Sequence, residues 1–250
     1  MINMTVICHF FNEEYLLPWW LKHHRSIFKN GIMINYGSTD QSVKIIKDLC
    51  PNWVVVNSMN GEFHSSSIDR EVELYERRVE GYRIVLNVTE FLVGNFSKLS
   101  DTNPLNYYCP TVVCVATEEE EGLYPNEDVG LIRQVSKGTL SYFLSKKNIL
   151  NDGSRLLHCN KNITYPVGRH YWFEGCEDFL VFRLKYFPWN DKFIKRKTQI
   201  AGKQSKLDVA MGLGFQHQFS LDELTKDLKE HQRNSIDISY LKRNLEYLSY

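Results

Sequence analysis

The chain lacks an excess of charge of either sign. Lys and Arg together number 30, Asp and Glu together number 30, and the formal net charge is zero. Proteins that attract nucleic acid through their overall electric field carry a basic excess, so the composition disfavours nucleic acid as a partner. Hydrophobic residues make up 43% of the 250 residues, which is enough to bury a sizeable core in an ordinary globular fold.

Long apolar runs are also missing. No segment approaches the roughly 18 consecutive apolar residues that a transmembrane helix needs. The N-terminus leads straight into an expected strand, without the basic and then apolar stretch of a secretory signal. We therefore expect a cytoplasmic protein with no transmembrane segment, for which peripheral contact with a membrane stays open.

Cysteine pairs of the Cys-x-x-Cys type are absent. The six cysteines are scattered along the chain, and Cys8 and Cys114 fall inside expected buried strands. This pattern predicts reduced thiols in the core rather than a framework of disulfides.

The first ninety residues alternate between strands and helices. Short apolar runs predict strands over 6–10, 32–35, 53–56 and 82–86. Helices are expected between them, over 19–24, 43–49 and 65–80. Strands that alternate with helices in this way form a parallel sheet through right-handed crossovers.

The alternation loosens after residue 93. Further strands are expected over 111–116, 154–158, 171–173 and 179–184, and residues 97–108 are expected to be a loop. Helices are expected over 192–203, 221–232 and 236–248. We therefore predict an α/β fold with a mostly parallel sheet flanked by helices. One domain would cover 1–218, and a helical extension over 219–250 would pack on the same domain.

Two polar elbows follow the first two expected strands. Residues 11–14 read Phe-Asn-Glu-Glu, and residues 35–40 read Asn-Tyr-Gly-Ser-Thr-Asp. The carboxyl ends of neighbouring parallel strands meet at one edge of a sheet, where open α/β sheets bind nucleotides. These residues therefore predict a nucleotide site. N-caps of the helices that follow would explain the same residues without any ligand.

The two elbows resemble the start of GT-A glycosyltransferases, specifically the family 2-like group. The segment between them, Leu-Pro-Trp-Trp-Leu-Lys-His-His over 17–24, is similar to the Trp-Leu-rich helix of that group. The resemblance is strong over 4–93 and patchy over 154–218. It implies a GT-A, Rossmann-like fold and transfer of a sugar from a nucleotide-sugar donor to the hydroxyl of a glycan or glycoconjugate. The nucleotide site that it implies comprises Phe11, Asn12, Glu14, Asn35, Ser38, Asp40, Asn87 and Thr89.

The chain departs from the group where its metal motif should lie. The group carries Asp-x-Asp-Glu-Phe at the end of the fourth strand, and here Asn87 and Thr89 take the two aspartate positions before Glu90. A hard cation prefers anionic oxygens, so the site has lost two charges. We expect weak or absent dependence on Mn²⁺ or Mg²⁺. Glu90 and His170 are the candidate metal ligands, and the resemblance makes His158 a second choice to His170.

The catalytic base and the phosphate clamp are less well defined by the sequence. Inverting transfer needs a carboxylate near the acceptor. Glu127 and Asp128 are candidates, together with Glu177 and Asp178, and the sequence does not choose among them. His158 is a further candidate catalytic residue. The basic helix expected from residue 192 would clamp phosphate without a metal, or else it is a solvated basic face.

Two rival functions stay open. The loss of the aspartates also fits a protein that binds a nucleotide sugar and does no chemistry. A nucleotidyltransferase shares phosphate chemistry at strand ends, but its first loop is usually rich in glycine and basic residues. Residues 11–14 contain neither glycine nor lysine, which counts against this alternative.

Overall fold

Four parallel strands form the first sheet of the protein, which is described by a computed structural model over residues 2–100, 102–140, 153–171, 176 and 178–242. The strand order is β3-β2-β1-β4. These strands are β1 (Met4–Phe10), β2 (Asn30–Asn35), β3 (Val54–Asn57) and β4 (Tyr82–Val85). All seven residues of β1 are buried, as expected for a strand covered on both faces. The predicted parallel sheet is confirmed.

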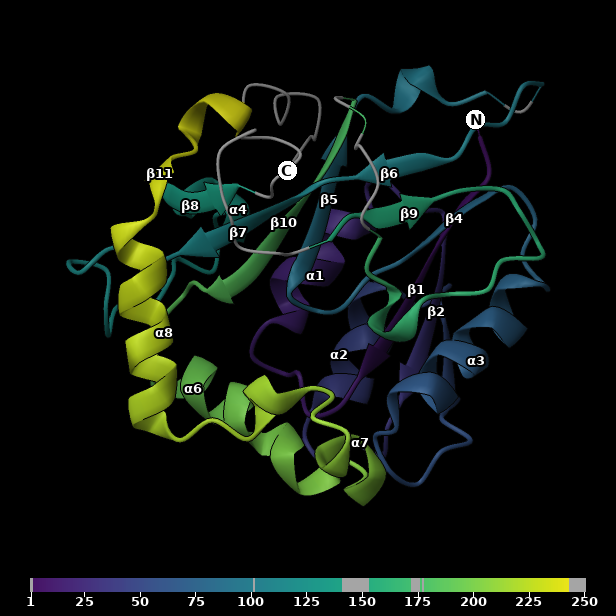
Figure 1. The fold of residues 1–250 in the computed structure, drawn as a ribbon. Coiled ribbons are helices and arrows are strands. Elements are labelled where there is room, and N and C mark those ends of the chain that lie inside the picture. Colours follow the sequence, from purple (N-terminus) through teal and green to yellow (C-terminus); the bar gives the residue numbers. More distant parts are fainter. Residues whose placement is uncertain (1, 101, 141–152, 172–175, 177, 243–250) are drawn as a thin grey trace.

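Helices cover both faces of this sheet (Figure 1). They are α1 (Leu17–His24), α2 (Ser42–Leu49) and α3 (Ser65–Glu76). Successive side chains of a strand point to opposite faces, so Val6 and Ile7 enter different clusters. Val6 joins the main core with Trp20 of α1. Ile7 packs with Val72 of α3 in a separate, smaller cluster.

A second, mixed sheet follows along the chain. Its order is β11-β8-β7-β10-β5. The strands are β5 (Glu90–Gly94), β7 (Thr111–Val115), β8 (Lys137–Leu140), β10 (Phe179–Tyr186) and β11 (Ile236–Asp237). A further pair, β6 (Tyr107–Cys109) and β9 (Arg155–Leu157), is antiparallel. His158, directly after β9, bridges to Arg83 of β4 and so links this pair to the first sheet.

The C-terminal part of the described chain is mainly helical. It contains α6 (Asp191–Thr198), the 3₁₀ helix η3 (Gln199–Lys203), α7 (Lys206–Ala210), η4 (Phe215–His217) and α8 (Leu221–Arg233). Shorter helices elsewhere are η1 (Phe96–Lys98), α4 (Leu131–Gln134) and η2 (Val167–Arg169). Leu224 and Leu228 of α8 are buried in the main core. Among the described residues, no helix has the length and apolar character to cross a bilayer.

Three sequence expectations are corrected by these elements. Residues 90–94 form the separate strand β5, not an end of the fourth strand, because they pair with β10 of the other sheet. The expected loop over 97–108 contains η1 and the start of β6. The expected helix over 236–248 is wrong at its start, since 236–237 pair with the open edge of β8, which offers backbone partners. Residues 172–173 and 243–248 lie outside the described residues.

Candidate functional site

The two elbows lie side by side, as the sequence predicted. The backbone N–H of Asn12 donates to Ser38 Oγ at 3.0 Å, and the N–H of Thr39 donates to Asn12 Oδ1 at 2.8 Å. The N–H of Glu14 donates to Asp40 Oδ2 at 3.0 Å. Asn12 adopts φ +50°, a left-handed conformation that asparagine tolerates and that turns the elbow sharply after β1. The polar side chains of the elbows therefore satisfy each other's backbone.

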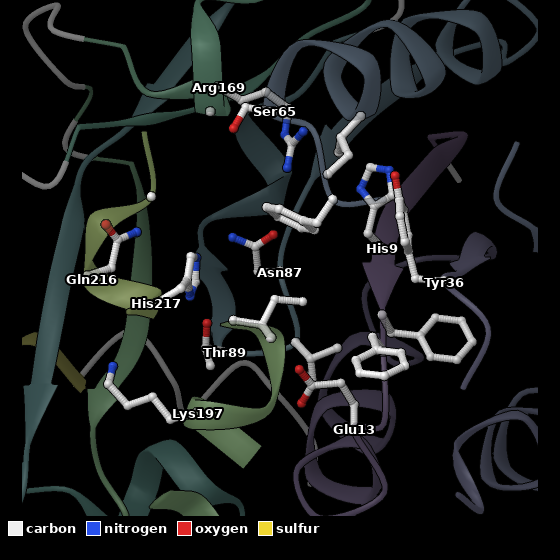
Figure 2. A pocket seen from close by; sticks show the side chains of 18 of the residues that line it. His9, Glu13, Tyr36, Ser65, Asn87, Thr89, Arg169, Lys197, Gln216 and His217 are labelled. Atoms are coloured by element: carbon white, nitrogen blue, oxygen red, sulfur yellow. The ribbon is translucent and has the colours of Figure 1, made fainter. Parts of the chain in front are cut away.

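A cavity of about 370 Å³ opens beside these elbows. Figure 2 shows His9 and Tyr36 on one side of it and Lys197, Gln216 and His217 on the other. Of the predicted nucleotide residues, Phe11, Asn87 and Thr89 line the cavity. The lining excludes the other five, which are Asn12, Glu14, Asn35, Ser38 and Asp40.

Basic side chains dominate the charged lining of the cavity. The described lining residues include two carboxylates, Glu13 and Asp69, against six cations. The cations are Arg155 from β9, Arg169 from η2, Arg183 and Lys185 from β10, and Arg196 and Lys197 from α6. Such a concentration of positive charge in a concave site attracts anions.

Lys197 has no carboxylate within salt-bridge distance among the described residues. Its ammonium donates to the Lys185 carbonyl at 3.3 Å and lies 4.9 Å from the centre of the Tyr186 ring. Burial, and then the charges of Lys185, Arg183 and Arg196, lower the pKa of Lys197 to about 7. An anion in the cavity would relieve both effects.

The histidines of the cavity are neutral at pH 7. Burial and the neighbouring cations lower the pKa of His217 to about 4. The charge of Arg155, followed by burial, lowers the pKa of His170 to about 2. Burial also holds the pKa of His9 well below its ordinary value. Neither ring nitrogen of His9 has a hydrogen-bond partner among the described residues, although the side chain is buried. Buried polar atoms without partners are rare, and these two nitrogens lie at the cavity wall, where a ligand could pair with them.

The predicted metal ligand Glu90 is already paired with a positive side chain. Glu90 is buried and ion-paired, with Arg155 Nη2 at 2.6 Å from its Oε1. Its other oxygen accepts the Asn87 N–H at 2.9 Å. Burial raises the pKa of Glu90, but the charge and hydrogen bond of Arg155, the charge of Arg183 and the Asn87 N–H together lower that pKa below its ordinary value. Within the described residues, no group of three His, Cys, Asp or Glu side chains could hold a metal.

The predicted catalytic residues lie apart from the cavity. The lining includes none of Glu127, Asp128, Asp178 and His158. Glu127 and Asp128 are exposed in the loop before α4. His158 is fully buried, 3.3 Å from both Glu76 Oε1 and Tyr165 Oη. Glu177 lies outside the described residues.

Sequence reasoning missed most of the charged lining. Glu13 forms a bidentate pair with Arg196 of α6, in which Nη2 lies 2.6 Å from Oε1. Asp69 of α3 pairs with Arg169 and accepts the Gly168 N–H at 2.9 Å. One usable signal lay in β10, where Arg183 and Lys185 alternate within an otherwise apolar strand. Two charges on one face of such a strand indicate a lined cavity.

No family model matches the sequence. No curated protein matches it either. The fold is similar to residues 1–349 of S. aureus TarS in complex with UDP-GlcNAc, with a TM-score of 0.37 and 13% identity over 66% of this chain and 49% of that chain. This chain therefore spans about half the length of that structure.

Two further solved structures are similar. Glucosyl-3-phosphoglycerate synthase from Mycobacterium tuberculosis, with Mn²⁺ and UDP, gives a TM-score of 0.29 and 12% identity over 36% of this chain and 34% of that one. HddC from Yersinia pseudotuberculosis gives a TM-score of 0.38 and 13% identity, over 78% of this chain and 98% of that one. At these values the likenesses carry no argument about function.

Proposed function

We propose that the protein is a glycosyltransferase that moves a sugar from a nucleotide-sugar donor to an acceptor hydroxyl. We further propose that basic side chains, in place of a metal ion, neutralise the leaving diphosphate. The observation that carries this proposal is the cation-rich cavity at the carboxyl ends of β1, β2 and β4. Open α/β sheets bind nucleotides at this edge, and the resemblance of residues 4–93 to family 2-like enzymes supports the same reading.

The two sides of the cavity suit the two parts of such a donor. The side formed by β1 and β2 offers the rings of Phe11 and Tyr36, together with the unpartnered His9. Aromatic faces and a neutral imidazole suit a nucleoside. The opposite side offers the α6 and β10 cations, including Lys197, which suit phosphates.

Charge on the leaving diphosphate grows as the bond to the sugar breaks. Fixed positive groups stabilise that charge in a cavity where water is scarce. The metal-dependent members of the group are expected to use Asp-x-Asp and a divalent ion for this step. Here Asn87 and Thr89 are neutral, and the lining cations would stabilise the charge of the leaving diphosphate instead.

The acceptor hydroxyl must also lose its proton. The two carboxylates that line the cavity, Asp69 and Glu13, are the candidate bases, because burial raises the pKa of both. We place Asp69 first. Arg196 holds both oxygens of Glu13, whereas Arg169 contacts Asp69 through one nitrogen and its Nε has no partner among the described residues.

The test is a thermal-shift and turnover panel with UDP-, GDP- and dTDP-sugars, each with Mn²⁺ or with EDTA. A cognate donor at a hundredfold excess over its dissociation constant should stabilise the protein by about 2.7 kcal/mol. Donor hydrolysis or transfer should survive EDTA. Asp69→Asn should abolish turnover while the donor still binds. Glu13→Gln weakens the other ion pair and tests the second candidate base, and it should lower turnover much less.

Three outcomes would contradict the proposal. Stabilisation by no sugar nucleotide rejects it outright. Binding without any transfer or hydrolysis favours a non-catalytic nucleotide-sugar-binding protein. Release of pyrophosphate from a nucleoside triphosphate and a sugar phosphate favours a nucleotidyltransferase.

A further inference from the structure

The short helix α7 buries its carboxylate and exposes its apolar side chains, which is the reverse of an ordinary surface helix. Its carboxylate, Asp208, is fully buried and accepts both the N–H and the hydroxyl of Ser65 at 2.7 Å, at the start of α3. Its apolar side chains face outward instead: Leu207 is 56% exposed and Val209 46%. A helix normally buries its apolar face and exposes its charges. The carboxylate that fixes α7 to α3 therefore leaves the apolar residues on the surface.

Exposed apolar residues continue beyond α7. Met211 is 63% exposed, Phe215 62% and Leu221 54%. We call Leu207, Val209, Met211, Phe215 and Leu221 the α7–α8 patch. Isolated apolar residues are normal on a protein surface, but such a concentration within residues 207–221 indicates a contact surface. Figure 1 shows α6, α7 and the start of α8 along one edge of the molecule.

Basic residues precede this patch in the chain. Residues 192–207 contain six basic residues and no acidic one. Arg196 and Lys197 line the cavity, which leaves Lys192, Lys195, Lys203 and Lys206. Lys195 and Lys206 are exposed and have no partner among the described residues. Positive charge beside exposed apolar side chains complements an anionic bilayer, whose phosphates lie directly above its hydrocarbon.

We propose that the α7–α8 patch docks the protein on an anionic lipid membrane. The apolar side chains enter the boundary between headgroups and acyl chains, and the lysines contact lipid phosphates. Leu213, Gln216 and His217, which line the cavity, belong to the same segment. Docking would therefore hold the cavity beside the membrane surface. This inference goes beyond the proposed sugar transfer and does not depend on it.

Co-sedimentation with vesicles tests the proposal without any sugar nucleotide, so failure here is separate from failure of the transfer reaction. The wild-type chain should sediment with phosphatidylcholine–phosphatidylglycerol vesicles, and much less with phosphatidylcholine alone or at high salt. Met211→Ser with Phe215→Ser should lower the partition coefficient at least about tenfold, because two large apolar groups leave the lipid boundary. Each of Lys195→Gln and Lys206→Gln should lower it about fivefold.

Matched controls come from the chain segment that leads into β6, and Figure 1 shows β6 at the end of the molecule opposite α7. Leu105, 51% exposed, gives Leu105→Ser, and the exposed Lys98 gives Lys98→Gln. Both should leave binding unchanged. If the double variant unfolds by circular dichroism, the single variants Leu207→Ser and Leu221→Ser replace it.

Four results would overturn the proposal. Vesicle binding could be absent, or it could be equal on neutral and anionic lipid. Binding could also survive all of the patch substitutions. Finally, sedimentation velocity could show a dimer that the Met211→Ser, Phe215→Ser variant dissociates, which would assign the patch to a second copy of the chain.

Discussion

The two walls of the cavity satisfy their polar groups in opposite ways. In the elbows, the side chains of Asn12, Ser38 and Asp40 pair with backbone groups of the neighbouring elbow. On the wall formed by β10 and α6, Lys197 is placed among other cations and has no carboxylate partner in the described part of the chain. In the elbow wall, formed by residues 11–14 and 35–40, these polar side chains therefore satisfy each other's backbone. In the cationic wall, we expect an anion to supply the missing negative charge.

This difference separates residues that hold the loops in position from residues that would bind a ligand. A tight loop at the end of a buried strand must satisfy its backbone groups, and short polar side chains do so locally. A cluster of like charges gains nothing for folding and is typical of a binding site. We therefore expect the elbow residues to shape the cavity and the cations to provide its affinity for an anionic ligand.

We expect the largest effect, a loss of stability, from breaking the buried ion pair of Arg155 and Glu90 between the walls. Arg155→Met leaves the Glu90 carboxylate, whose side chain is 2% exposed, without its partner. We expect a loss of about 3–5 kcal/mol in the free energy of unfolding, measured by urea titration. Adding Glu90→Leu should recover part of that loss, because no buried charge then remains.

The matched control is Lys44→Met, which breaks the exposed pair with Asp48 and should cost less than about 1 kcal/mol. A metal role for Glu90 would show itself differently. Mn²⁺ would then stabilise the wild-type chain, and Arg155→Met would strengthen that effect by freeing the carboxylate.

Within the cationic wall, substitution of Lys197 should lower donor affinity the most. Lys197→Met removes a charged donor that faces the cavity, and donor affinity should fall about 10–100-fold by isothermal titration calorimetry. Lys195→Met removes the same charge from the exposed side of α6 and should leave affinity unchanged. Equal losses in both variants would show that only the general field matters.

Substitutions in the elbow wall should lower the stability of the protein more than its affinity for the donor. Asp40 accepts the N–H groups of Glu14 at 3.0 Å and Ser42 at 2.9 Å. Asp40→Ala should lower the free energy of unfolding by about 1–2 kcal/mol, since two hydrogen bonds are lost. Donor affinity, measured on the folded fraction, should fall less than for Lys197→Met. Abolished binding at full stability would instead place Asp40 against the ligand.

The sequence predicted the elbow wall much better than the cationic wall. The strand β1, the turn after it and the meeting of both elbows follow from local signals within forty residues. The cations come from β9, η2, β10 and α6, and their convergence depends on how the second sheet packs against the first. Single-sequence patterns do not encode that packing, and β5 was likewise missed because its partner, β10, is distant in the chain.

The smallest effect, and the sharpest test of the cationic wall, is its pH dependence. With the pKa of Lys197 lowered to about 7, the free protein should lose this charge as the pH rises through 7. An anionic donor favours the charged form, so affinity should be highest below pH 7 and fall about tenfold between pH 6 and 8. His217 and His170, with pKa values of about 4 and 2, stay neutral over this range.

Stability of the free protein should change in the opposite direction. The folded state depresses the pKa of Lys197, so above pH 7 the unfolded chain binds more protons at this position and stability rises with pH. A nucleotide sugar is the right ligand for this experiment, because its doubly esterified diphosphate does not titrate near neutrality. Lys197→Met should flatten the affinity profile. A profile that keeps its slope in this variant would show that another group on the wall carries the charge that binds the donor.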